Sequence, residues 1–157
     1  MRKKDQFLFG YTWEPAFWTN EGFSFMIQSD GTAIYKKFLV DDQELSCETI
    51  QIENNIVAEL KKYLLERKSI IKDLPKETFN GSVDGGYDTF TFLGKSMTSL
   101  NADIYIIESP KNEYEKQMIP VFQAEKNAIE IFIGGIDILK KSSHRFTAKN
   151  WGKLCSW

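Results

Sequence analysis

The strongest structural constraint in this sequence is a pair of apolar runs on either side of a tight turn. Residues 23–28 (FSFMIQ) have the composition of a β-strand, and residues 32–38 (TAIYKKF) form a similar run. Ser29-Asp30-Gly31 lies between them, and an Asp-Gly pair at such a point is a strong hairpin signal. A third run at 44–52 follows another turn, and its alternation predicts an inner face of Leu45, Cys47, Thr49 or Ile50, and Ile52. We therefore predict an antiparallel meander, which needs a cover over its apolar face.

An amphipathic helix directly after the meander can provide that cover. Asn54-Asn55 are good N-cap residues, and Pro75 is expected to end the helix. Between residues 56 and 73, the apolar side chains recur at the spacing of one helical face, at Val57, Leu60, Leu64 and Ile71. This pattern predicts a helix that packs on the sheet.

The second half of the chain contains further strand signals and one ambiguous segment. Residues 89–93 and 96–100 alternate around a Gly-Lys turn, and residues 103–107 form another β-like run. Within residues 111–141, a helical pattern competes at residues 129–139 with a hairpin that would turn at Gly134-Gly135. We favour the helix, because its apolar stripe begins upstream at Phe122; the two glycines would then allow close packing on the sheet. Pro120 could break this helix or open a second one.

The chain length of 157 residues fits one domain, residues 1–157. The predicted fold class is α+β, with an antiparallel sheet (the N-terminal meander plus later strands) covered on one face by two helices. The formal net charge is −2, but residues 138–157 alone carry +5, so a basic C-terminal segment begins at about residue 140. The sequence shows no signal peptide and no apolar run long enough to span a membrane, which predicts a cytoplasmic location and no membrane partner.

The scarcity of cysteine and histidine excludes most site chemistry. Zinc sites need several Cys or His ligands, and this chain has only Cys47, Cys155 and His144. We predict that both cysteines are small apolar fillers, although a Cys–His catalytic pair stays open as a minor alternative. No metal site, cofactor or catalytic constellation is predicted, so we expect a protein that is not an enzyme.

Two segments supply the candidate binding residues. Eight aromatic residues lie between Phe7 and Phe25, and they could form core, a protein-binding surface or a stacking platform for a small ligand. The loop 79–88 is rich in Gly, Asn and Asp, which favours tight turns but also allows a partner contact or a weak cation site. The candidate binding residues are Trp13, Glu14, Phe17 and Trp18 from the first segment, and Asn80, Asp84, Tyr87 and Asp88 from the second.

Three short motifs carry a resemblance to a group of known proteins. They are F-x-I-x-S-D-G-x-x-x-Y (residues 25–35), N-G-S-x-D-G (residues 80–85) and N-x-I-x-I-F (residues 127–132). The pattern resembles small α+β proteins of low-GC bacteria, some of which are similar to immunity proteins of polymorphic toxin systems. The resemblance covers about a third of the chain. It implies binding and brings no catalytic residues.

These observations support three hypotheses of function. The leading one is a non-enzymatic interaction module, such as an immunity protein that neutralises a cognate toxin. The net negative charge of residues 1–137 would suit a basic toxin domain. The alternative is a small-ligand-binding domain or weak hydrolase that uses the aromatic loop 11–23. Nucleic-acid binding through the basic C-terminal segment comes third, and it is the least favoured because the charge of that segment is modest. The sequence does not specify an oligomeric state.

Overall fold

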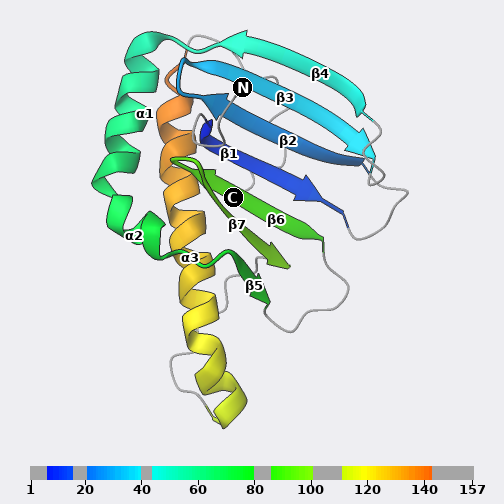
Figure 1. The fold of residues 1–157 in the computed structure, drawn as a ribbon, viewed down its shortest axis with the longest axis vertical. Helices are drawn as coiled ribbons and strands as arrows, with labels where there is room; N and C mark the ends of the chain where they lie inside the picture. Colours follow the sequence, from blue (N-terminus) through cyan, green and yellow to red (C-terminus); the bar gives the residue numbers. More distant parts are fainter. Residues whose placement is uncertain (1–6, 16–20, 40–43, 80–85, 101–110, 143–157) are drawn as a thin grey trace.

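The computed structural model describes residues 7–15, 21–39, 44–79, 86–100 and 111–142. One seven-stranded sheet and its helices form the fold, which confirms the predicted α+β class (Figure 1). The elements are β1 (Phe7–Glu14), β2 (Glu21–Gln28), β3 (Thr32–Leu39), β4 (Glu44–Gln51), α1 (Asn54–Glu66), α2 (Lys68–Asp73), β5 (Glu77–Phe79), β6 (Tyr87–Phe92), β7 (Lys95–Leu100) and α3 (Glu113–Leu139).

The sheet has the strand order β4-β3-β2-β1-β6-β7-β5. The predicted hairpin is present: Gly31 has a positive φ of 89°, and the Asp30 side chain accepts a hydrogen bond from the Thr32 N–H at 2.9 Å. The pairs are antiparallel except at one edge, where β5 runs parallel to β7. The predicted antiparallel sheet is therefore confirmed, and the short parallel strand β5 is an addition that the sequence did not indicate, because three residues are too few to show a periodic pattern.

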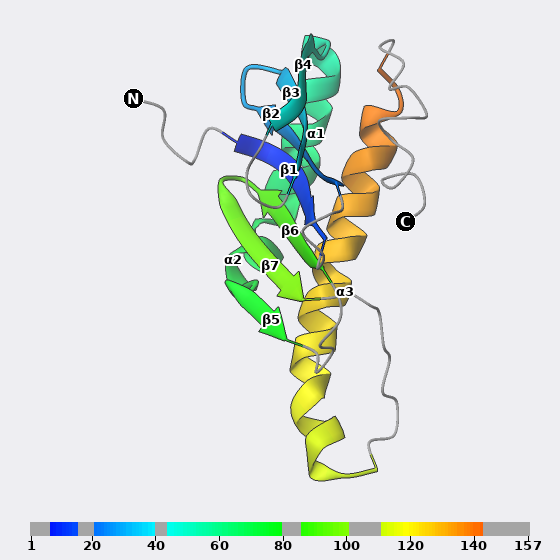
Figure 2. The ribbon, with the colours of Figure 1, turned by 90° about the vertical axis from the view of Figure 1, so that its right-hand side faces the viewer.

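An aromatic core joins one face of the sheet to α3, which crosses that face (Figure 2). The ring of Phe132 stacks on Phe9 at a centroid distance of 5.3 Å and meets Tyr11 at 5.1 Å and Phe90 at 5.6 Å. We call this side of the sheet the helix face and the other side the open face. On the open face, hydroxyl pairs cross the strands at Thr12–Ser24, Thr89–Thr98 and Thr91–Ser96.

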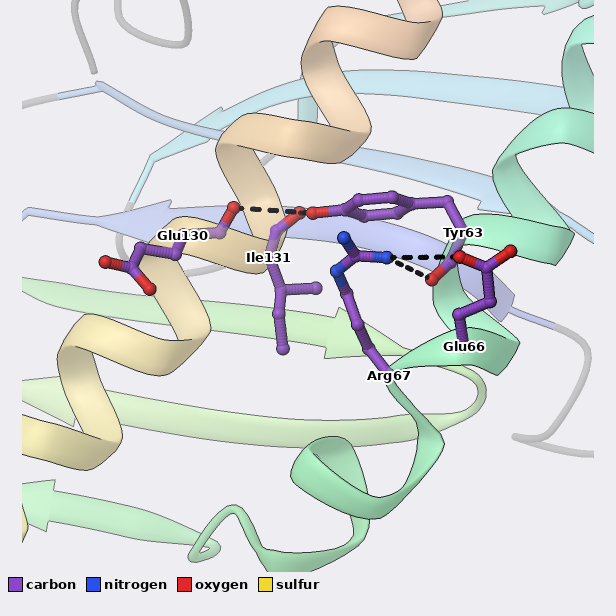
Figure 3. A network of polar contacts seen from close by, with 5 residues as sticks. All are labelled: Tyr63, Glu66, Arg67, Glu130 and Ile131. Carbon is purple, nitrogen blue, oxygen red and sulfur yellow. Dashed lines mark hydrogen bonds and ion pairs between the residues drawn. The ribbon is translucent and has the colours of Figure 1, made fainter.

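Helix α1 packs antiparallel to α3 through a network of polar contacts (Figure 3). The Tyr63 hydroxyl donates to the backbone carbonyl of Ile131 at 3.1 Å. The Arg67 guanidinium lies 3.7 Å from the centroid of the Tyr63 ring and donates to the Tyr63 carbonyl at 2.9 Å. At the other end of α1, Ser142 donates to Glu53 at 2.7 Å. These contacts fix α1 along the C-terminal half of α3.

Residues 113–139 form one continuous helix, so the helical interpretation is confirmed and the hairpin is wrong. The two glycines lie where α3 meets its neighbours. A Cβ atom at Gly135 would come within 2.3 Å of the Phe9 ring, and one at Gly134 within 2.0 Å of the Tyr63 hydroxyl. Gly135 therefore allows close packing on the sheet, as predicted, whereas Gly134 allows close packing on α1 instead of the sheet. Pro120 lies within the helix and neither ends nor begins it.

Several local predictions differ from the structure. The predicted 56–73 helix is interrupted at Arg67 into α1 and α2, and its N-cap residue is Glu53 rather than an asparagine. Leu45 and Cys47 were expected on the inner face of their strand, but both are exposed, whereas Ile52 is buried. Cys47 is therefore not an apolar filler. The predicted strand at 103–107 lies outside the described residues.

Within the described part of the chain, no helix combines the length and the apolar character needed to cross a membrane.

Candidate functional site

The structure brings together the four predicted site residues that it describes. Trp13 pairs with Asp88, and Glu14 pairs with Tyr87, in consecutive positions of the β1–β6 ladder. These residues come from two segments more than 70 positions apart in the sequence. The other four predicted residues lie outside the described part of the chain: Phe17, Trp18, Asn80 and Asp84.

The two pairs point to opposite faces of the sheet, because successive side chains of a strand alternate. Trp13 and Asp88 lie on the helix face, where Trp13 packs partly buried against the core and Asp88 is only 4 % exposed. Glu14 and Tyr87 lie on the open face, where Glu14 is exposed and Tyr87 is 47 % exposed. A molecule bound over Glu14 and Tyr87 would therefore lie on one face of the sheet, and the Asp88 carboxylate lies on the other.

Strand register extends the exposed pair into a row across the sheet. Gly22 lies next to Glu14 on β2, because the antiparallel register pairs Trp13 with Phe23 and continues outward to Glu14 and Gly22. Gly22 pairs with Phe38 on β3, and Phe38 pairs with Glu44 on β4. The Phe38 ring occupies the space into which a side chain at Gly22 would project. We call this set the strand-end row: Tyr87, Glu14, Gly22, Phe38 and Glu44.

The strand-end row carries two aromatic rings and two carboxylates on one end of the sheet. Glu44 is exposed and lies 3.8 Å from the Lys36 amine, an ion pair weakened by solvent. Such a combination suits the side chains of arginine and lysine, since a carboxylate neutralises the charge and an aromatic ring packs against the flat or aliphatic part. Sequence reasoning missed Phe38 and Glu44. Phe38 was predictable from the sequence, because the turn at Asp30-Gly31 sets the register of β2 and β3 and therefore the residue opposite Gly22.

Between the helix face of the sheet and α3, two carboxylates are buried among hydroxyl groups. The Tyr11 hydroxyl donates to the Asp88 carboxylate. The Glu125 carboxylate of α3 is fully buried and accepts from Ser99 at 2.8 Å and Thr78 at 3.0 Å. Ser99 also pairs with Asp88 across β6 and β7, so the two carboxylates lie over neighbouring strands. Hydrogen bonding to hydroxyls is what allows such groups to be buried.

Burial and charge raise the pKa values of two tyrosines on the helix face, Tyr11 and Tyr35. Desolvation raises the pKa of Tyr11 far above its usual value, and the charge and hydrogen bond of Asp88 raise it further. Desolvation and, to a smaller extent, the Glu48 charge raise the pKa of Tyr35 to about 12. Tyr11 therefore stays protonated at neutral pH and keeps donating to Asp88.

A shallow groove of about 330 Å³ lies elsewhere, between α2 and α3. It shares no residue with the strand-end row or with the buried carboxylates. Its lining residues are Ile70, Asp73, Leu74, Pro120, Gln123, Ala124 and Asn127.

The fold and the site define an α+β protein with an acidic and aromatic surface at one end of its sheet. No protein-family model, curated protein or solved structure shows a significant match to this chain.

Proposed function

We propose that this chain is a non-enzymatic protein-binding module of the cytoplasm, of the kind that bacterial immunity proteins represent, and that it neutralises a basic partner. The observation that supports the proposal is the strand-end row. Its exposed Glu14 and Glu44 carboxylates and its Tyr87 and Phe38 rings offer charge and contact area to lysine and arginine side chains. Complementary charge accelerates association with such a partner.

The arrangement of the carboxylates favours binding over a ligand-processing role. A weak hydrolase would need an acid and a base facing one substrate. Glu14 and Asp88, the two predicted carboxylates in the described residues, lie on opposite faces of the sheet. Asp88 is also buried and accepts the Tyr11 hydroxyl hydrogen. We therefore place the small-ligand alternative second.

The proposal is tested by co-expression with the product of the adjacent gene. We expect that product to inhibit growth alone, to be neutralised by this chain, and to co-purify with it. The variant Glu14→Lys/Tyr87→Ala should weaken the complex at least tenfold. The matched control Glu113→Lys/Tyr114→Ala changes the same residue types at exposed positions of α3 and should leave binding unchanged. A product of the adjacent gene that is neither toxic nor bound would refute the proposal. Equal losses of affinity in the two double variants would show that the strand-end row does not contact the partner.

A further inference from the structure

Strand β4 forms one edge of the sheet, and its outer side faces away from every described element (Figure 1). Residues 44–49 are all exposed. The strand is eight residues long, or about 26 Å, enough to pair along its whole length with another strand. Natural proteins protect edge strands with charged side chains, especially lysine, with proline, with bulges or by making the strand short. The sequence of β4, ELSCETIQ, has neither lysine nor proline, and its one register shift lies at its first residues, so Ser46 to Gln51 form a regular edge.

The register shows which backbone groups of β4 point outward. The Ile52 N–H donates to the Gly31 carbonyl at 2.9 Å, which makes Gly31 and Ile52 a hydrogen-bonded pair. Hydrogen-bonded and non-bonded pairs alternate along an antiparallel ladder. Ile50 and Glu48 therefore direct their N–H and C=O groups to β3. Cys47, Thr49 and Gln51 direct theirs outward, and these six groups can receive an added strand.

The charge of the edge indicates what kind of strand fits. β4 carries Glu44 and Glu48 and no basic residue. A register shift between Lys37 and Phe38 places Glu44 on the open face, opposite Phe38. Glu48 lies on the helix face, opposite Tyr35. An added strand therefore meets a carboxylate on each face, which favours lysine or arginine side chains. A second copy of this chain would instead bring two further carboxylates to the same edge.

We infer that β4 binds an extended segment of a basic protein partner by strand addition, with Cys47, Thr49 and Gln51 supplying the backbone hydrogen bonds. This inference rests on the proposed function and specifies how the partner is held. β4 begins at Glu44, which is also the last member of the strand-end row. One partner can therefore contact the row with side chains and the edge with its backbone.

A peptide experiment tests the inference directly. The probe is a blocked heptapeptide of alternating lysine and valine, compared with a glutamate–valine version and with a lysine–valine version that has a central proline. We expect only the first to bind saturably and to slow amide hydrogen exchange at Cys47, Thr49 and Gln51. Equal binding of the glutamate peptide, or protection at other strands only, would overturn strand addition at β4.

Variants of β4 separate this inference from the proposed function. Thr49→Pro removes an outward N–H, so the fold should be retained while peptide and partner binding fall at least tenfold. Glu48→Lys, which lies on β4 outside the strand-end row, should also weaken binding without touching the backbone, and Glu130→Lys on α3 is the control. A partner that binds the wild type and all β4 variants equally refutes the inference but leaves the proposed function intact. A dimer of the wild-type chain that Thr49→Pro dissociates would assign the edge to a second copy instead.

Discussion

Replacing Gly135 by alanine tests whether close packing of α3 on β1 explains the glycines in that helix. The new Cβ would lie 2.3 and 2.6 Å from two carbons of the Phe9 ring, about an ångström closer than ordinary carbon contact. The ring is fully buried, and neighbouring rings restrict its movement: Phe132 stacks on it at 5.3 Å, and Phe92 lies at 5.8 Å. The backbone of β1 or α3 must therefore shift.

The expected loss of stability follows from two opposing effects. Overpacking a core destabilises by about 1–3 kcal/mol, and the restricted ring places Gly135→Ala near the upper end. Alanine in place of glycine within a helix stabilises by about 1 kcal/mol. The net loss is then about 2 kcal/mol, or a fall in Tm of about 4–8 °C for a domain of this size.

Urea unfolding followed by circular dichroism measures this loss, and a double-mutant cycle assigns it. Phe9→Leu makes room for the new methyl group, so the double variant should be at least 1 kcal/mol more stable than the sum of the single effects predicts. Gly134→Ala is the matched control. Its Cβ meets the Tyr63 hydroxyl at the far end of a half-buried ring, which can move aside by giving up its hydrogen bond to Ile131, so the loss should be smaller than for Gly135→Ala. Additive effects in the cycle, or a Gly135→Ala variant as stable as the wild type, would refute the close-packing explanation.

Three further predictions concern the buried polar groups. Tyr11→Phe removes the hydroxyl that donates to buried Asp88 and should destabilise the fold by about 1–3 kcal/mol in urea unfolding; an unchanged midpoint would mean that this bond contributes nothing. Glu125→Gln keeps an acceptor for Ser99 and Thr78, so it should be more stable than Glu125→Ala, and the reverse order in thermal unfolding would contradict the assigned bonds. The pKa of Tyr35 is raised from 10.0 to about 12, so its contribution to stability is fully present below pH 10 and is lost as the pH rises toward 12. Urea unfolding across this range should show a shallower decline for Tyr35→Phe than for the wild type, and identical slopes would contradict the shift.

The sequence by itself determined the meander, the α+β class and the amphipathic helix. Asp30-Gly31 and the spacing of Val57, Leu60 and Leu64 are local signals, which do not depend on distant contacts. The hairpin turn also fixed which residues of β2 and β3 face each other. For the candidate site, the sequence identified Trp13, Glu14, Tyr87 and Asp88 as residue types, but it did not indicate that they are neighbours.

Only the tertiary structure decided which of these residues face solvent. Pairing of β1 with β6 brings Glu14 beside Tyr87 and sends Asp88 to the opposite face, and no local pattern specifies that pairing. The register shift in β4 places Glu44 on the open face, and Leu45 and Cys47 are exposed against expectation. Residues 129–139 fit two local structures, and contact with Phe9 and Tyr63 explains two glycines within a helix. The side of a strand that is buried depends on the strands and helices packed against it, and those contacts join residues far apart in the sequence.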